Sequence, residues 1–137
     1  MRKTIQEPPE TSEKEKKITI YFEEAMQEKI NSDGNFSKFI EQVERGLKEI
    51  TRKLDFKLIC TFKLRVDFEI PTWEKIILSI QLIPAKSDFE EKINLWDELD
   101  DVIRGKIKKL LNSHLNESDK ISTNNLNEKF YIEINPL

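Results

Sequence analysis

The sequence has few of the residues that reactive sites most often need. It contains one cysteine, one histidine and three glycines in 137 residues. A single cysteine excludes an internal disulfide and a metal site built from several thiolates. GxxxxGK[ST], GxGxxG, GxSxG and HExxH motifs are all absent, which excludes the usual phosphate-binding loops and hydrolase signatures. These absences make an enzyme a minority interpretation, and we predict no cofactor and no metal.

Long apolar runs and an excess of one charge are also missing. No segment approaches the ~20 apolar residues that cross a bilayer, and residues 1–17 have no apolar core like that of a signal peptide. We therefore expect a soluble, cytoplasmic protein. The net charge is −3 although 36% of the residues are charged, so the chain lacks the broad basic excess of a general nucleic-acid binder. We expect residues 1–17 to be a flexible charged tail and residues 18–137 to form one α+β domain.

Two alternating patterns predict a long hairpin. Apolar side chains lie at even numbers in residues 56–70 and again in residues 73–83, which is the period of a strand. The first segment exceeds the usual strand of ~5–6 residues, so it is either one long strand or a strand split by a bend or bulge. Directly opposed residues of a hairpin lie on the same face of the sheet, so even-numbered residues must pair with even-numbered residues. The predicted register pairs Phe68 with Ile76, Val66 with Leu78, Leu64 with Ile80, Phe62 with Leu82 and, on the other face, Glu69 with Lys75.

Two segments have helical periodicity. Residues 36–54 carry apolar side chains at three- and four-residue steps, with Asn35 available as a cap and Gly46 either needed for close packing or simply tolerated. Residues 88–112 form a longer helix with an apolar stripe that begins at Phe89 and includes Trp96. Its start resembles a capping box of Ser87 and Glu90.

The remaining segments complete the order of elements. Residues 18–30 read as a short strand followed by a helical turn, or alternatively as one helix. Residues 112–127 are polar and predict a loop, and residues 129–134 predict a closing strand. The preferred order is β-α-β-β-α-β, which is the ferredoxin-like split pattern of an antiparallel sheet with both helices on one face. If residues 18–30 are helical, the order becomes α-α-β-β-α-β and the central ββα unit is unchanged.

Candidates for chemistry are few. The long helix carries an acidic cluster in which Asp97 and Asp101 are four residues apart, as two ligands of one cation would be. A metal-dependent hydrolase is one interpretation, and a solvated helix face is favoured over it. The single histidine, His114, fits a helix end better than a catalytic role, and Cys60 lies on the apolar face, where we expect an inert thiol. The acidic cluster consists of Asp97, Glu98, Asp100 and Asp101.

The odd-numbered face of the hairpin is the more informative surface. A basic sheet with exposed aromatics is how RNA-recognition domains bind single strands, but the phenylalanines of residues 56–70 lie on the other face and Trp73 falls in the turn. Isoleucines on this solvent-exposed face indicate either a homodimer or protein partner, or a bent strand with scattered surface residues. The candidate nucleic-acid residues are Lys57, Lys63, Arg65 and Lys75, and the candidate interface residues are Ile59, Ile77 and Ile83.

One region resembles a known family. The segments DFEIPTWEKI (67–76), DFEEK (88–92) and LWDEL (95–99) resemble a pattern in small uncharacterised prokaryotic, chiefly archaeal, proteins, over roughly residues 67–104. The family has no assigned activity, so the resemblance supports the ββα core and implies no site residue. The sequence therefore predicts a non-enzymatic interaction or regulatory module, acting as a homodimer or as the partner of another protein. Single-stranded RNA binding is the alternative, and the hydrolase is a third.

Overall fold

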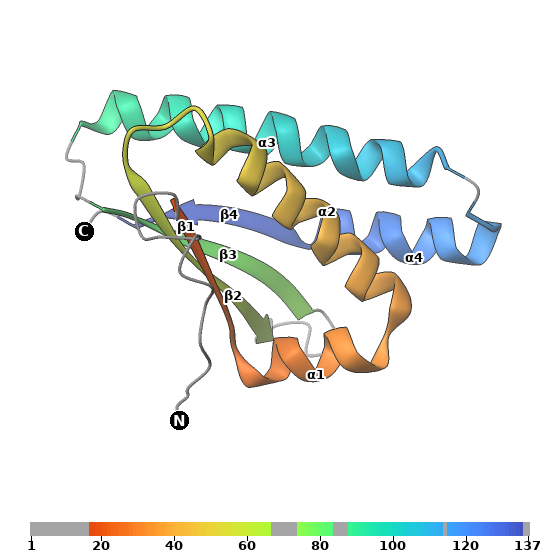
Figure 1. Ribbon diagram of the computed structural model, residues 1–137. Helices are drawn as coiled ribbons and strands as arrows, with labels where there is room; N and C mark the ends of the chain where they lie inside the picture. Colours follow the sequence, from red (N-terminus) through yellow and green to blue (C-terminus); the bar gives the residue numbers. More distant parts are fainter. Residues whose placement is uncertain (1–16, 67–73, 84–87, 114, 136–137) are drawn as a thin grey trace, which may run out of the picture.

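The computed structural model describes residues 17–66, 74–83, 88–113 and 115–135. Within these ranges the chain is an α+β protein with one sheet of four strands and with four helices (Figure 1). None of the described helices is long and apolar enough to cross a membrane. In chain order the elements are β1 (Ile18–Phe22), α1 (Glu24–Ser32), α2 (Gly34–Thr51), β2 (Lys57–Val66), β3 (Glu74–Ile83), α3 (Phe89–Leu111), α4 (Glu117–Glu128) and β4 (Phe130–Ile134).

The sheet is mixed rather than antiparallel. Its strands follow the order β1-β2-β3-β4. β2 and β3 form an antiparallel hairpin, β1 pairs in parallel with β2, and β4 pairs in parallel with β3. This differs from the predicted ferredoxin-like arrangement, in which a third strand would separate the two parallel strands of each βαβ unit. Here each crossover joins two strands that are direct neighbours.

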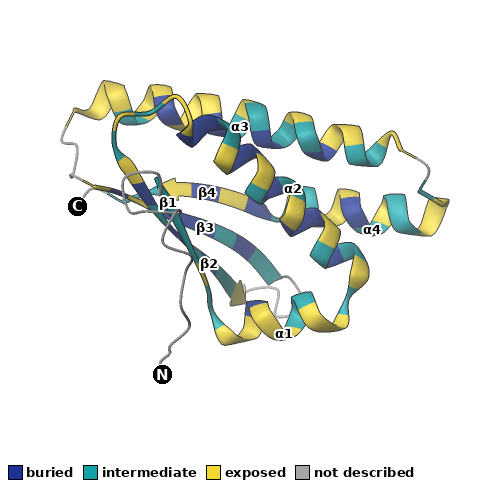
Figure 2. Ribbon diagram, viewed as in Figure 1, coloured by how far each residue is buried: buried dark blue, intermediate teal, exposed yellow. Residues whose placement is uncertain are grey.

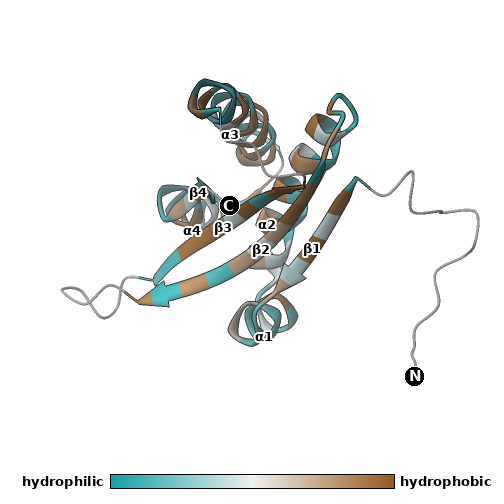
Figure 3. Ribbon diagram, turned by 90° about the vertical axis from the view of Figure 1, so that its left-hand side faces the viewer, coloured by the Kyte–Doolittle hydropathy of each residue, from teal (hydrophilic) through white to brown (hydrophobic). Residues whose placement is uncertain are grey.

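The helices cover one face of this sheet. Most even-numbered side chains of β2 and β3 are buried beneath α2 and α3 in a single core, although Val66 at the end of β2 is 55% exposed (Figure 2). The alternation in the sequence dictates this, because one face of each strand is apolar and must be covered. Among the described elements, no helix lies on the odd-numbered face of the sheet (Figure 3). The helix-covered face therefore carries the core, and the other face carries the candidate functional residues.

The first three elements largely follow the pattern in the sequence. The strand followed by helix that was predicted for residues 18–30 is confirmed as β1 and α1, so the fully helical alternative is wrong. α2 is confirmed with its apolar stripe buried. Its cap is Asp33 rather than Asn35, because the Asp33 carboxylate accepts hydrogen bonds from the amides of Asn35 and Phe36. Gly46 of α2 packs closely against Ile103 of α3, so the glycine is needed for close packing and is not simply tolerated in the helix.

The hairpin has the predicted parity but a different register. Phe62 lies opposite Leu78 and Val66 lies opposite Glu74, so each β2 residue pairs four positions earlier in β3 than predicted. The alternating pattern determines only on which face of the sheet each residue lies. A shift of the pairing by four positions leaves every residue on the same face. Lys75 consequently lies opposite Arg65 instead of Glu69. Residues 67–73, which contain Phe68, Glu69 and Trp73, fall outside the described residues.

The second half contains one helix that the sequence pattern did not reveal. α3 is confirmed, although its cap is Asp88, whose carboxylate accepts from the amides of Glu90 and Glu91, while Ser87 falls outside the described residues. The loop predicted for residues 112–127 is wrong, because Glu117–Glu128 is the helix α4. Thr123 is its one buried residue, so its apolar stripe is too weak to detect. The closing strand is confirmed as β4.

Candidate functional site

The face of the sheet that the described helices leave uncovered carries all seven hairpin residues that were predicted to contact nucleic acid or a protein partner. It consists of the odd-numbered side chains of the four strands, which lie on the opposite side of the sheet from the buried even-numbered ones. We call this surface the open face. Its residues are Thr19, Tyr21, Lys57, Ile59, Thr61, Lys63, Arg65, Lys75, Ile77, Ser79, Gln81, Ile83, Tyr131 and Glu133.

The basic side chains of the open face differ in their partners. Arg65 donates from both terminal nitrogens to the Glu23 carboxylate, at 2.9 and 3.0 Å, which fixes the guanidinium and lowers the pKa of Glu23. Lys75 Nζ lies 5.7 Å from the centre of the Tyr131 ring, in a cation–π contact. Lys57 and Lys63 form no ion pair with any described residue, so both ammonium groups are available to a ligand.

Two exposed tyrosines belong to the same face. Tyr21 of β1 is 56% exposed and Tyr131 of β4 is 45% exposed. Tyr21 lies opposite Thr61, which lies opposite Ser79, so small polar side chains occupy the row between the outer strands. The hairpin itself adds no aromatic side chain to this face, as predicted, and both tyrosines come from the outer strands. Both tyrosines have odd numbers in their strands, but only the strand order shows that they share a face with the basic residues.

The isoleucines of the open face are only partly available. Ile59 and Ile77 are half-buried by their neighbours, and Ile83 is 38% exposed at the end of β3. Ser79, at the centre, is buried, and its hydroxyl accepts a hydrogen bond of 3.0 Å from Asn135 Nδ2. The face is thus mixed in character, with apolar, aromatic, hydroxyl and basic groups side by side.

The other candidate residues do not come together. Asp100 is bonded to Arg104 at 3.1 Å and Glu98 is paired with Lys53 at 3.5 Å. Among the described residues, no group of three or more His, Cys, Asp or Glu side chains is arranged to hold a metal ion. Cys60 is buried, and its burial raises the pKa of the thiol to about 12. His114 falls outside the described residues.

A second surface lies between the start of α3 and the edge strand β4. It is a mainly apolar groove of about 390 Å³, to which Phe89, Ile93 and Trp96 contribute from α3 and Ile132 and Ile134 from β4. The sequence predicted that this part of the α3 stripe is buried, yet Phe89 is 74% exposed. The buried positions of α3 begin only at Leu95, so the first turns of the helix extend beyond the core.

Comparisons with protein-family models, with curated proteins and with solved structures found no match. We therefore infer the function from the geometry of the open face and from the chemistry of its side chains.

Proposed function

We propose that this protein is a non-enzymatic binding module whose open face takes up single-stranded nucleic acid. One observation carries the proposal: two exposed tyrosines, from β1 and β4, share an uncovered sheet face with four basic side chains. A sheet of this kind offers rings for bases to stack on and cations for phosphates. No reaction is needed to explain the arrangement, since its groups recognise charge and flat rings.

Electrostatics support a polyanionic ligand. The open face carries Lys57, Lys63, Arg65 and Lys75, while its own carboxylate is Glu133 and its neighbour Glu23 is already bonded to Arg65. The whole chain has a net charge of −3, so positive charge is concentrated on this face and negative charge elsewhere. Such an asymmetry orients an approaching polyanion toward the sheet. Each phosphate contact should also release counterions, which makes the affinity dependent on salt.

The aromatic groups supply the second half of the argument. Tyr21 and Tyr131 lie three strand intervals apart across the sheet, about 14 Å at ~4.8 Å per interval, and two residues apart along the strands. Stacking of a base on such a ring contributes roughly 1–3 kcal/mol and tolerates any sequence. Thr61 and Ser79 continue the row of Tyr21 toward Glu133, whereas Ile77 and Lys63 continue the row of Tyr131, so the two rings lie diagonally across the face. We therefore expect binding with little preference among bases.

The main rival is a protein partner on the same face. Ile59, Ile77 and Ile83 would be its apolar contacts, and the sequence analysis favoured this interpretation. The exposed apolar area that they offer is modest, because two of the three isoleucines are half-buried. A protein partner also gives no role to Lys57 and Lys63, which form no ion pair within the described ranges. These two observations favour a nucleic-acid ligand over a protein partner.

The test is fluorescence anisotropy with labelled single-stranded RNA and DNA homopolymers at several salt concentrations. Affinity should fall linearly with the logarithm of salt, and Lys57→Glu with Lys63→Glu should weaken binding at least tenfold. The matched control is Lys108→Glu with Lys109→Glu, which makes the same change of charge on exposed residues of α3. Tyr21→Ala with Tyr131→Ala should weaken binding without changing the salt slope.

Two results would contradict the proposal. One is the absence of binding at low salt by the unaltered protein. The other is an equal loss in the α3 control, which would mean that only the net charge matters. Either result would return the open face to the protein-partner interpretation, and alanine substitution of Ile59 and Ile77 would then be the next experiment.

A further inference from the structure

The β4 edge of the sheet is capped by side chains. In the parallel ladder with β3, the even-numbered residues of β4 direct their backbone groups outward. The Trp96 indole donates to the carbonyl of Ile132 at 2.7 Å, and Arg104 Nη2 donates to the carbonyl of Phe130 at 2.7 Å. Helix α3 therefore satisfies two outward carbonyls of this strand, which is one of the usual ways to protect a sheet edge.

The β1 edge is left open. The carbonyl of Lys17 and the amide of Glu23 bond to β2, so Ile18, Ile20 and Phe22 direct their backbone groups away from the sheet. No hydrogen bond links these outward groups to any part of the described chain. In Figure 3, β1 forms the border of the described fold and no helix lies beyond it.

The usual protections of an edge strand are missing from β1. Its sequence, ITIYF, contains no charge, proline or glycine, and its pairing with β2 runs without a bulge. Natural edges of this kind attract another strand unless a charge or proline prevents it. The strand is also partly apolar on both faces, because Ile18, Ile20 and Phe22 are half-buried and Tyr21 is exposed. An added strand would bury these side chains further.

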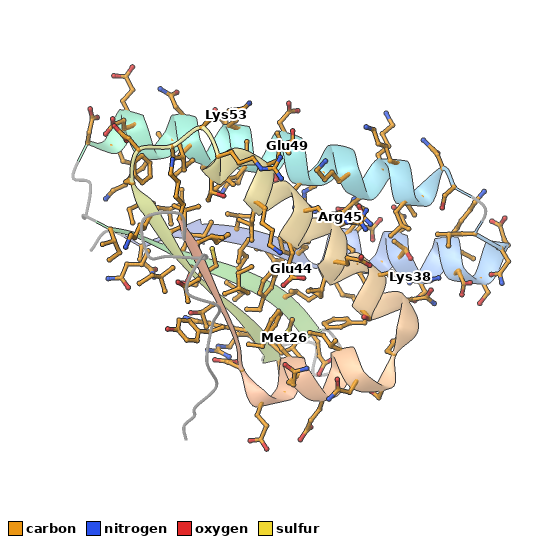
Figure 4. The ribbon with its side chains drawn as sticks, in the orientation of Figure 1. Met26, Lys38, Glu44, Arg45, Glu49 and Lys53 are labelled. Atoms are coloured by element: carbon orange, nitrogen blue, oxygen red, sulfur yellow. The ribbon has the colours of Figure 1, made fainter. Side chains whose placement is uncertain are left out.

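The flank of α2 above this edge is divided by charge. Glu41, Glu44, Lys48 and Arg52 follow one another at helical spacing, with the acids toward the start of α2 and the bases toward its end. Lys48 and Arg52 line a small hollow together with Ile18, which places the C-terminal part of this flank beside the start of β1. Figure 4 shows Glu44 on the side of α2 that faces Met26, away from Glu49 and α3. Glu44 is half-buried and accepts no hydrogen bond from a described residue.

We infer that the β1 edge pairs with the β1 edge of a second copy, antiparallel about a two-fold axis through Ile20. This register places Ile18 opposite Phe22 and Thr19 opposite Tyr21 of the second copy, so β-branched and aromatic side chains face each other. Every outward donor meets an acceptor of the second copy. The same axis reverses α2, which brings Glu41 and Glu44 opposite Lys48 and Arg52 of the second copy. The interface is therefore self-complementary in hydrogen bonding, shape and charge, as a two-fold dimer requires.

The dimer would contain one continuous sheet of eight strands. Directly opposed residues of an antiparallel pair point to the same side, so both helical layers would lie on one side and both open faces on the other. The two Tyr21 rings would then lie near the axis in the middle of a doubled open face. Pairing of the edges does not depend on what the open face binds, so it stands or falls separately from the proposed function.

Light scattering behind size exclusion, across a range of concentrations, tests the pairing. The unaltered chain should rise from 16.3 kDa toward twice that mass. Thr19→Lys with Tyr21→Lys would set like charges opposite each other twice while leaving the helix-covered face unchanged. It should raise the dissociation constant roughly tenfold or more. Gln81→Lys with Tyr131→Lys, on β3 and β4 of the open face and so away from this edge, is the matched control and should leave the mass unchanged.

A charge-reversal pair tests the α2 flank independently. Glu44→Lys alone should weaken the dimer, because it places like charges near Lys48 of the second copy. Adding Lys48→Glu to the same chain should restore the dimer, since the reversed pattern is again self-complementary. A mass of 16.3 kDa at every concentration up to about 1 mM, where binding is worth only ~4 kcal/mol, would overturn the inference. A dimer that survives the Thr19 and Tyr21 changes would do so too, because it would form through another surface.

Discussion

At the scale of single residues, Gly46 determines how closely the two main helices pack. A Cβ at this position would come within 2.7 Å of Ile103 Cγ1 and 3.2 Å of Ile103 Cα, so part of the conflict is with backbone. Alanine would improve helix propensity by about 1 kcal/mol, but overpacking typically costs ~1–3 kcal/mol. Gly46→Ala should therefore lower the free energy of unfolding, as measured by urea denaturation.

The chain offers a matched control for that change. Gly105 lies inside α3, and a Cβ there would meet nothing within 4 Å. Gly105→Ala should raise the free energy of unfolding by ~0.5–1 kcal/mol, because only the helix propensity changes. If both alanine variants stabilise the protein equally, α2 and α3 are not in the close contact described here.

Two glutamates of α2, five residues apart, should respond to pH with opposite signs. Burial raises the pKa of Glu44, whereas a hydrogen bond from Lys106 at 2.8 Å lowers the pKa of Glu49 (Figure 4). A raised pKa in the folded state means that ionised Glu44 destabilises the fold at neutral pH, and this cost disappears as pH falls below the ordinary glutamate value. Glu49 contributes stability at neutral pH and loses it on acidification.

The matching variants are Glu44→Gln and Glu49→Gln. At pH 7 the first should raise the thermal midpoint and the second should lower it or leave it unchanged. The difference at Glu44 should vanish near pH 3, below the ordinary glutamate value, whereas the difference at Glu49 should disappear only as pH falls through its lowered pKa in the folded state. Thermal unfolding at micromolar concentration, between pH 3 and 7, measures this. A Glu44→Gln variant that is less stable than the unaltered chain at pH 7 would show that Glu44 is paired rather than merely desolvated.

At the scale of elements, the sequence predicts what local periodicity encodes. The alternation of β2 and β3 and the stripe of α2 are strong because one face of each element is apolar throughout. α4 was missed because it packs through little more than Thr123 and Leu126. The register of the hairpin could not be predicted for a different reason. The alternating pattern determines only that even-numbered residues pair with even-numbered ones, and the length of the connection between the strands determines which of them pair.

The candidate site shows the same limit. The basic residues and isoleucines of the open face all lie on one hairpin, so their common face follows from the sequence alone. Tyr21 and Tyr131 are 110 positions apart in the chain, and each lies in a strand of five residues. Nothing local indicates that β1 and β4 flank the hairpin on either side. The aromatic half of the site therefore depends on the strand order, which is a property of the whole molecule.

At the scale of the whole molecule, the strand order requires two crossovers of opposite hand. Both connections step across the sheet in the same direction, from β1 to β2 and from β3 to β4, yet their strands run in opposite directions. Because α2 and α3 lie on the same face, one connection must be right-handed and the other left-handed. About 98% of such crossovers are right-handed. In the split, ferredoxin-like order, where each crossover spans a third strand, both crossovers can be right-handed with their helices on one face.

Hydrogen exchange distinguishes the two orders at β1. In the split order β1 lies inside the sheet, so all of its amides should be protected. At an open edge only the amides that bond to β2, those of Thr19 and Tyr21, should be protected, and those of Ile18, Ile20 and Phe22 should exchange quickly. We expect this alternation in the Thr19→Lys, Tyr21→Lys variant, which should be monomeric, read at the two new lysine amides and at their even-numbered neighbours. In the unaltered chain the even-numbered amides should gain protection as concentration rises, since the second copy would bond to them. Uniform protection of β1 in a proven monomer would rule out the β1-β2-β3-β4 order and the open edge together.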